Sequence, residues 1–279
     1  MQPVLENIFN HGRDAFIRFY NRGHKYEISC DPTSKYTSVT TWNHTHFPKF
    51  DADAVIQNIF KGKNWGPDNK YWGMTAEQIK QSWKSNGDAV SGAGTTLHNR
   101  IECYMNNPNL PPNYTHKDLY DLYTMEHSGQ IDAQVEWEYF LEFVKDTPEL
   151  KPYRTEWMIF DEDVKLAGSI DMVYENPDGT LRIYDWKRSK DITNKNNWNK
   201  FATNPLIQHL PDSNFWHYSL QLNTYKTILE RKYGKIVTHL YLVRLHPDMT
   251  EETYELLEVP ILTSEMRLLF EEREKQINT

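Results

Sequence analysis

Three charged side chains lie close together near the middle of the chain, in a stretch that reads as two strands joined by a tight turn. Asp171 precedes the turn, and Asp185 and Lys187 follow it. The intervening residues 176–179 read Asn-Pro-Asp-Gly, in which proline presets φ at the first corner and glycine accepts the left-handed position. A three-residue loop at this turn places Asp171 directly opposite Asp185.

Asp171, Asp185 and Lys187 also share one face of the predicted sheet, because side chains alternate along a strand, and Trp186 points to the other face. Directly opposed side chains lie about 5 Å apart, where like charges destabilise a sheet. Two facing carboxylates in otherwise apolar strands favour a bound cation, and oxygen ligands suit Mg²⁺ or Mn²⁺. The alternative is an exposed hairpin whose acids face water.

Length and composition restrict the class of protein. A chain of 279 residues with 38% hydrophobic residues can form one large globular domain or two small ones. It has no apolar run of about 18 residues and no signal peptide at its start, so we expect an intracellular protein that is not in a membrane. Two cysteines, Cys30 and Cys103, cannot form a four-cysteine zinc or iron–sulfur site, and no disulfide is expected between them.

The net charge of −8 at first argues against a nucleic-acid partner. Nine acidic and three basic residues follow residue 247, however, so this segment alone carries −6 and the rest of the chain only −2. A basic cluster directly follows the second acidic strand and comprises Lys187, Arg188, Lys190, Lys195 and Lys200. Its place beside a candidate metal site favours contact with phosphates over a merely solvated face.

The elements that must position these residues are mostly helices first and strands later. Apolar periodicity predicts helices over 4–21, 51–61, 75–85, 87–106 and 130–145. Thr75 and Gln78 fit a capping box at the start of the third helix. Strands follow over 153–160, 166–175 and 180–187, then a loop over 188–212, a helix over 214–233, strands over 236–245 and 253–259, and a helix from 264 to about 276. This order predicts an α/β sheet with helical cover, with a catalytic core over 87–279 and an N-terminal helical elaboration over 1–86.

Two helices carry further polar pairs. His98 and Glu102 share one face of the helix over 87–106 because they are four residues apart. A single helical histidine is more often structural, but imidazole is also a suitable third metal ligand beside two carboxylates. Gln221 and Tyr225 share a face of the helix over 214–233, and this pair alone indicates no function.

Taken together and in order, these segments resemble the PD-(D/E)XK nuclease superfamily, and within it the RecB-like branch. That branch includes phage and large-virus exonucleases and the mitochondrial genome maintenance exonuclease. The matches are Gly94 to His98 for G-x-x-x-H, Gly168 to Asp171 for G-x-x-D, Asp185 to Lys187 for D-x-K, and Gln221 to Tyr225 for Q-x-x-x-Y. Residues 36–41 also look like the S-V-T-T element of phage members. Ile170 departs from the family's proline, as is common in this branch.

The resemblance implies a restriction-endonuclease-like core, in which helices flank a mixed central sheet. It also implies a metal-dependent DNA exonuclease that prefers single-stranded or frayed ends and acts in replication, recombination or repair. His98, Asp171, Asp185 and the Trp186 carbonyl would hold one or two Mg²⁺ or Mn²⁺ ions, and no iron–sulfur cluster is implied. Asp171, Asp185 and Lys187 would be catalytic, with Lys187 orienting or deprotonating the attacking water.

The remaining site residues have less direct roles. Residues expected to contact DNA are Ser38, Thr40, Arg188, Lys190, Gln221 and Tyr225. Glu102 and Glu156 are expected to support the site, although Glu156 could equally form a salt bridge at its rim. One alternative function is a structure-specific endonuclease. Another is an inactive DNA-binding module, but the intact set of ligands argues against an inactive module. Carboxylates about 5 Å apart also suit a retaining glycosidase, but neither the lysine nor the histidine has a role in that chemistry.

Overall fold

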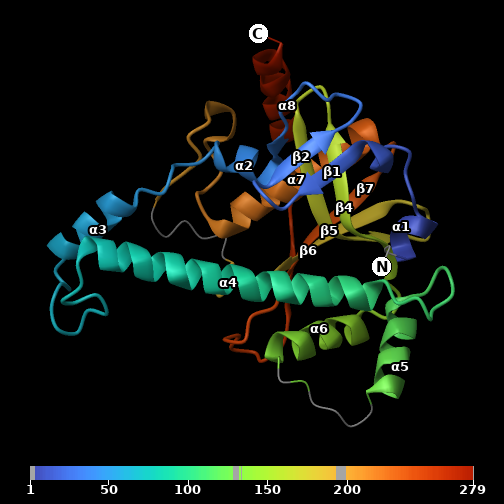
Figure 1. Ribbon diagram of the computed structural model, residues 1–279, viewed down its shortest axis with the longest axis horizontal. Coiled ribbons are helices and arrows are strands. Elements are labelled where there is room, and N and C mark those ends of the chain that lie inside the picture. Colours follow the sequence, from blue (N-terminus) through green and yellow to red (C-terminus); the bar gives the residue numbers. More distant parts are fainter. Residues whose placement is uncertain (1–3, 128–131, 133, 193–198, 279) are drawn as a thin grey trace.

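The structure is a computed structural model that describes residues 4–127, 132, 134–192 and 199–278. Its centre is a twisted mixed sheet, and one long helix, α4 (Ala76–Met105), runs across one end of this sheet (Figure 1). The described part of the chain contains no helix that is both long and apolar enough to cross a membrane.

The central sheet has the order β3-β5-β6-β7-β8, and β4 pairs separately with β5. The pairs β3–β5 and β6–β7 are parallel, whereas β4–β5, β5–β6 and β7–β8 are antiparallel. The strand bounds are Thr37–Ser38 for β3, Lys151–Asp161 for β4, Leu166–Glu175 for β5, Leu181–Lys187 for β6, Val237–Arg244 for β7 and Glu255–Glu258 for β8. The mixed sheet confirms the predicted fold class, and all five predicted strands are present.

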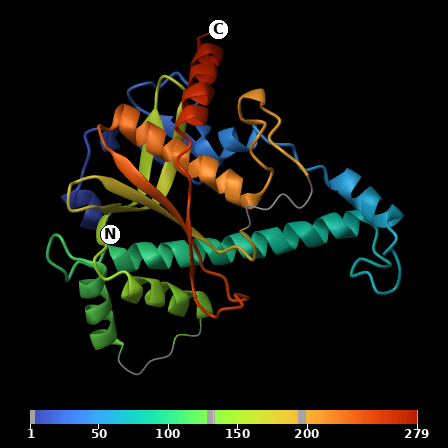
Figure 2. The same cartoon turned by 180° about the vertical axis from the view of Figure 1, so that it is seen from behind.

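Helices cover both faces of the sheet. On one face, α7 (Asn214–Lys232) and α8 (Thr263–Ile277) bury Leu222, Ile228 and Leu269 in the same core as Ile183 and Leu240 of the sheet. Figure 2 shows α7 lying across this face. On the other face, α4, α5 (His116–Glu126) and α6 (Val135–Asp146) form a second core, with Trp186 and Tyr184 packed against Phe143.

The turn between β5 and β6 has the predicted geometry. The Asn176 amide donates to the Thr180 carbonyl (2.8 Å), and Gly179 has φ +81°. Ladder pairs run from Glu175–Leu181 to Met172–Tyr184, so the predicted register is confirmed over this segment. Met172–Tyr184 is the last ladder pair between β5 and β6, whereas β6 stays paired with its other neighbour, β7, as far as Lys187–Arg244. Asp171 and Asp185 are the first residues past the last pair, so they flank an opening instead of forming a ladder pair.

The predicted helix over 4–21 is wrong. The segment forms the short helix α1 (Val4–Ile8), a turn of 3-10 helix and a two-stranded hairpin made of β1 (Ile17–Tyr20) and β2 (Lys25–Ile28). Long-range contacts explain the difference. Asp14 accepts hydrogen bonds from Arg154 (2.6 Å) and from the Trp157 indole (2.9 Å), and this fixes the chain in a turn just before β1.

The two helices predicted over 75–85 and 87–106 are one continuous helix, α4. The capping box at its start is confirmed, because the Gln78 amide donates to Thr75 Oγ1 and the Thr75 amide to Gln78 Oε1. The predicted boundary between the N-terminal elaboration and the catalytic core, at residues 86 and 87, lies inside α4. The two-part organisation of the chain stays a prediction. The helix α3 (Ala52–Lys61) was predicted, whereas α2 (Val39–His44) and α5 were not. With the first half of α4, α3 extends away from the sheet (Figure 1).

Candidate active site

The predicted metal-binding residues meet where β5 and β6 part. Asp171 lies on β5, Asp185 follows on β6, and His98 reaches them from α4. His98 Nδ1 lies 3.6 Å from Asp171 Oδ2, and its Nε2–H donates to the Trp186 carbonyl (2.9 Å). The Trp186 amide in turn donates to Asp171 Oδ2 (3.0 Å). The helix α4 therefore brings His98, which is distant in the sequence, to the two consecutive strands β5 and β6.

Asp185 and Lys187 form a buried ion pair on the side of β6 that faces α7. The Lys187 Nζ atom lies 2.5 Å from Asp185 Oδ2 and 4.5 Å from the centre of the Tyr218 ring. The Asp185 side chain is only 2% exposed, and its Oδ1 accepts no hydrogen bond from the described residues. A buried carboxylate oxygen without a donor is costly, so this oxygen is a suitable ligand for a cation.

The charges of the site perturb one another. Burial and the neighbouring Asp171 charge raise the pKa of Asp185 to about 6, although Lys187 acts in the opposite direction. Burial acts to lower the pKa of His98, but the carboxylates of Asp171 and Glu156 raise it to about 9. Burial also opposes the charge of Lys187, yet Asp185 and Asp171 hold its pKa above the usual range. The crowded carboxylates therefore favour additional positive charge.

Glu156 on β4 belongs to the same cluster. Its neighbours pair as Thr155–Met172 and Trp157–Ile170, which places Glu156 opposite Asp171. One ligand atom from each of His98, Glu156 and Asp171 lies within 4.8 Å of the others. Glu156 accepts a hydrogen bond from Ser169 Oγ (3.1 Å) and has φ +42°, a strained value for a residue inside a strand. Its ionic neighbour is His98, at 3.8 Å from Nδ1.

The helix α7 packs closely against β5 near these carboxylates. A Cβ atom at Gly168 would lie 2.7 Å from Cε1 of Tyr225, and Gln221 Nε2 donates to the Tyr225 hydroxyl (3.0 Å). The G-x-x-D and Q-x-x-x-Y segments are therefore in direct contact. The predicted DNA-contacting pair Gln221 and Tyr225 thus packs on β5 three residues before Asp171.

The S-V-T-T segment lies on the same side of the sheet. Ser38 pairs with Ala167 of β5, and its Oγ accepts from the Thr41 amide (3.1 Å) to cap α2. Thr40 and Gln221 both line a small cavity of about 130 Å³ that also includes Tyr218. Tyr218 also packs on Lys187, so this residue links the cavity to the predicted catalytic lysine.

The basic residues after β6 are engaged in ion pairs. Arg188 Nε donates to Glu136 Oε1 of α6 (2.6 Å), and its side chain is only 18% exposed. Lys190 is exposed, and its Nζ lies 3.1 Å from Asp248 Oδ2. Lys195 lies outside the described residues. Of the two predicted phosphate contacts, Lys190 is therefore the more accessible.

Two residues that lie at the site, Tyr218 and Ser169, were not among the site residues predicted from the sequence. Tyr218 lies three residues before Gln221, so the 3.6-residue helical period could have placed it on the same face of α7. Ser169 lies two residues before Asp171 on β5, so the alternation of the strand could have placed it beside that carboxylate. The predicted supporting residue Glu102 lies one turn after His98 on α4, and burial raises the pKa of its carboxyl, with Glu156 and Glu6 adding to this effect.

The chain is similar to one family of known proteins and, at low identity, to solved structures. The family model of the PD-(D/E)XK nuclease superfamily matches residues 111–278. The crystal structure of SSO0001 is 18% identical, with a TM-score of 0.24, over 44% of this chain and 50% of that protein, so the chain spans about half of its length. A candidate exonuclease from Eubacterium rectale is 13% identical, with a TM-score of 0.32, over 63% of this chain and 73% of that protein. No curated protein matches the sequence.

Proposed function

The chain belongs to the PD-(D/E)XK nuclease superfamily, and we propose that it is a metal-dependent deoxyribonuclease that degrades DNA from an end. We further propose that it prefers single-stranded or frayed ends and acts in replication, recombination or repair. The observation that carries the proposal is the convergence of His98, Asp171, Asp185 and Lys187 at the opening between β5 and β6.

The residues present fit a divalent cation. Asp185 Oδ1 is buried without a hydrogen-bond donor among the described residues. Nearby, His98 Nδ1 faces the carboxylates of Asp171 and Glu156, and one ligand atom from each of these three residues lies within 4.8 Å of the others. Carboxylate, carbonyl and imidazole ligands suit Mg²⁺ or Mn²⁺. Such an ion, when bound, would polarise the scissile phosphate and make an attacking water more acidic.

Lys187 is proposed to act on the phosphate and the water as a charged donor. The neighbouring carboxylates keep its pKa raised, so the ammonium group keeps its proton at neutral pH. A protonated lysine can orient the attacking water and stabilise the negative charge that develops on the phosphate, as preorganised donors do in other active sites. Tyr218 packs against the ammonium and limits the positions that it can adopt.

The preference for ends is supported by motifs that resemble those of exonucleases. The S-V-T-T segment and the Q-x-x-x-Y pair lie on adjacent elements, since α2 packs against α7. Thr40 and Gln221 line one small cavity beside Tyr218. A strand that reaches Lys187 would therefore pass residues of both segments.

The test compares labelled DNA substrates with and without Mg²⁺ or Mn²⁺. We expect metal-dependent degradation of linear single strands, little loss of a circular single strand of the same sequence, and no hydrolysis of an oligosaccharide panel. Strands labelled at the 5′ or the 3′ end report the polarity. The Lys187→Ala variant is the matched inactive control. Rapid cleavage of the circle would favour the internal cutter, and absence of any metal-dependent cleavage would refute the nuclease proposal.

A further inference from the structure

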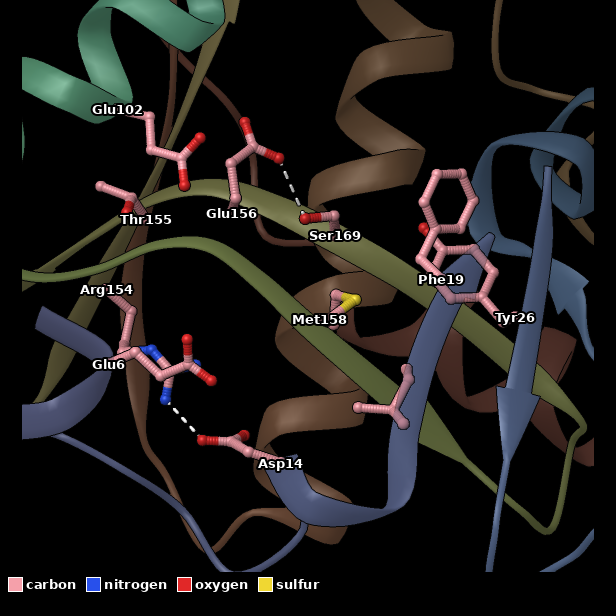
Figure 3. A pocket seen from close by; sticks show the side chains of 11 residues that line it. Glu6, Asp14, Phe19, Tyr26, Glu102, Arg154, Thr155, Glu156, Met158 and Ser169 are labelled. Carbon is pink, nitrogen blue, oxygen red and sulfur yellow. Dashed lines mark hydrogen bonds and ion pairs between the residues drawn. The ribbon is translucent and has the colours of Figure 1, made fainter. Parts of the chain in front are cut away.

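A cavity of about 330 Å³ adjoins the metal-binding cluster. It shares Glu156 and Ser169 with that cluster and extends from them toward the β1–β2 hairpin (Figure 3). Its walls come from α1, β1, β2, α4, β4 and β5. The cavity is thus built by segments between residues 6 and 169, and it lies directly beside the site at which the phosphodiester bond would be cut.

The cavity has one apolar and one polar wall. Phe19 of β1 and Tyr26 of β2 face it with ring centroids 4.8 Å apart, and Met158 lies beside them. Figure 3 shows these rings at one end and the carboxylates of Glu102 and Glu156 at the other. Flat aromatic rings are the surfaces on which nucleobases stack, and this stacking tolerates any base.

The charge of the cavity is negative. Its lining residues include four acids and one base, which are Glu6, Asp14, Glu102, Glu156 and Arg154. Arg154 is already paired with Asp14 (2.6 Å), so it does not neutralise the other carboxylates. Its buried Nε–H has no hydrogen-bond partner among the described residues.

We propose that this cavity binds the terminal nucleoside of the DNA strand and selects an end that carries a free hydroxyl over one that carries a phosphate. The inference rests on the proposed function. The volume lies at the lower end of the range for small-molecule pockets, as one nucleoside requires. The rings would hold the base, and the carboxylates would accept hydrogen bonds from its amino groups and from the terminal hydroxyl.

The negative charge explains why the occupant is terminal. An internal stretch of strand would bring a phosphate into the cavity at every nucleotide, and each phosphate would meet the carboxylates of Glu6, Glu102 and Glu156 at short range, where like charges repel strongly. Only a terminal nucleoside without its own phosphate avoids this repulsion. Since Glu156 also belongs to the metal-binding cluster, the first phosphodiester bond would then lie at the catalytic carboxylates.

The test uses single-stranded oligonucleotides that differ only at their ends. Each end carries a hydroxyl, a phosphate or an abasic residue in turn, and both binding (fluorescence anisotropy, with Ca²⁺ replacing Mg²⁺) and cleavage are measured. At the end from which cutting starts, we expect the phosphate and the abasic residue each to weaken binding and slow cleavage about tenfold. These comparisons use the wild-type protein, so they do not depend on the folding of a variant.

Matched variants assign the effect to the cavity. Phe19→Ala should remove most of the difference between an ordinary and an abasic end. Tyr20→Ala, one residue further along β1 with a side chain that does not line the cavity, should leave that difference unchanged. The double variant Glu6→Gln with Glu102→Gln should reduce the penalty for a terminal phosphate.

The outcomes separate this inference from the proposed function. If the wild-type protein cleaves DNA with metal but treats hydroxyl, phosphate and abasic ends alike, the inference is overturned and the nuclease proposal stands. If no DNA is cleaved under any condition, the nuclease proposal fails. Binding that still discriminates against abasic and phosphorylated ends would in that case support the cavity as a site for strand ends.

Discussion

The ring of Tyr225 lies so close to Gly168 that a Cβ atom at residue 168 would be 2.7 Å from Cε1 of the ring. This contact joins a strand residue three positions before Asp171 to a helix residue that hydrogen-bonds Gln221. Real Cβ contacts are essentially never this short, so the glycine is required by space. The contact sets the distance between α7 and β5 near the proposed catalytic carboxylates.

Gly168→Ala should therefore destabilise the protein by about 1–3 kcal/mol, because the added methyl group overpacks a buried contact. The matched control is Gly87→Ala in α4, where a Cβ would meet nothing within 4 Å. That substitution should stabilise the protein by up to about 1 kcal/mol, because alanine is the better helix former. Urea denaturation midpoints measure both effects. Equal effects of the two substitutions would show that Tyr225 can move aside.

A second prediction concerns the ion pair on β6. Asp185→Ala and Lys187→Ala should each abolish DNA cleavage, but they should differ in metal binding. Asp185 supplies a buried carboxylate oxygen that lacks a donor, whereas Lys187 supplies a positive charge and cannot be a ligand. Mn²⁺ titration calorimetry should thus detect binding to Lys187→Ala and much weaker binding to Asp185→Ala. Wild-type turnover by either variant would contradict the assignment.

His98 is expected to act as a metal ligand and not as a core residue. Its side chain is 26% exposed, and its Nδ1 faces Asp171 and Glu156. His98→Ala should weaken Mn²⁺ binding and cleavage about tenfold or more while changing the melting temperature little. Glu156→Gln is the informative comparison, because it keeps the side chain's size and loses its charge. A large loss of stability in His98→Ala, with unchanged activity per folded molecule, would instead indicate a structural role.

The sequence was sufficient for the second half of the fold and only partly sufficient for the first, in which α3 and α4 were predicted but the structure of residues 4–21 was not. The strand over 166–175 and the helix over 214–233 are long, with clear periodicity and a strong turn or glycine at their ends, so local signals determined them. Residues 4–21 have a helical pattern too, but Asp14 bonds to Arg154 and Trp157, which are about 140 positions away. Local periodicity cannot report contacts over that separation.

Part of the candidate site could likewise be predicted from the sequence and part could not. The turn at Gly179 set the register that brings Asp171 and Asp185 to the ends of paired strands, and this could be counted from the sequence. The end of the β5–β6 ladder at Met172 could not, because the local sequence does not specify where two paired strands separate. The left-handed backbone of Glu156 is likewise a tertiary effect, since glutamate has no local preference for positive φ.

Stability should depend on pH through His116, a residue with no part in the site. It is fully buried and lies 2.8 Å from the Tyr174 hydroxyl and 2.9 Å from Thr147 Oγ1, and burial lowers its pKa to about 3. The unfolded chain binds a proton there below about pH 6.5 and the folded chain does not, so this residue makes stability fall with decreasing pH.

Between pH 7.5 and pH 5, this single histidine should lower the free energy of unfolding by about 2 kcal/mol, because each unit of pH below the unfolded pKa contributes up to 1.36 kcal/mol. His116→Gln should be less stable than wild type at pH 7.5 and should lose less stability on acidification. Urea titrations of both proteins at pH 7.5 and at pH 5 measure the difference. Parallel losses in the two proteins would show that His116 does not remain neutral in the fold.

Binding of DNA should depend on salt through Lys190 and not through Arg188. Each lysine that contacts a phosphate contributes close to one unit to the slope of log K against log salt, and about 0.7 on single strands. Lys190 is exposed, and its partner Asp248 is exposed as well, so a phosphate can displace that partner at little cost. Arg188 is mostly buried against Glu136 and holds β6 to α6.

Lys190→Gln should therefore flatten the salt slope by about 0.7 on single-stranded DNA without changing stability. Arg188→Gln should leave the slope nearly unchanged and lower the denaturation midpoint, because it leaves a half-buried Glu136 carboxylate unpaired. Lys117→Gln on α5, which removes another exposed lysine of an ion pair, is the matched control for the loss of one charge. Fluorescence anisotropy between 50 and about 200 mM salt measures the slopes. A slope that changes with Arg188 and not with Lys190 would place the DNA against α6 instead.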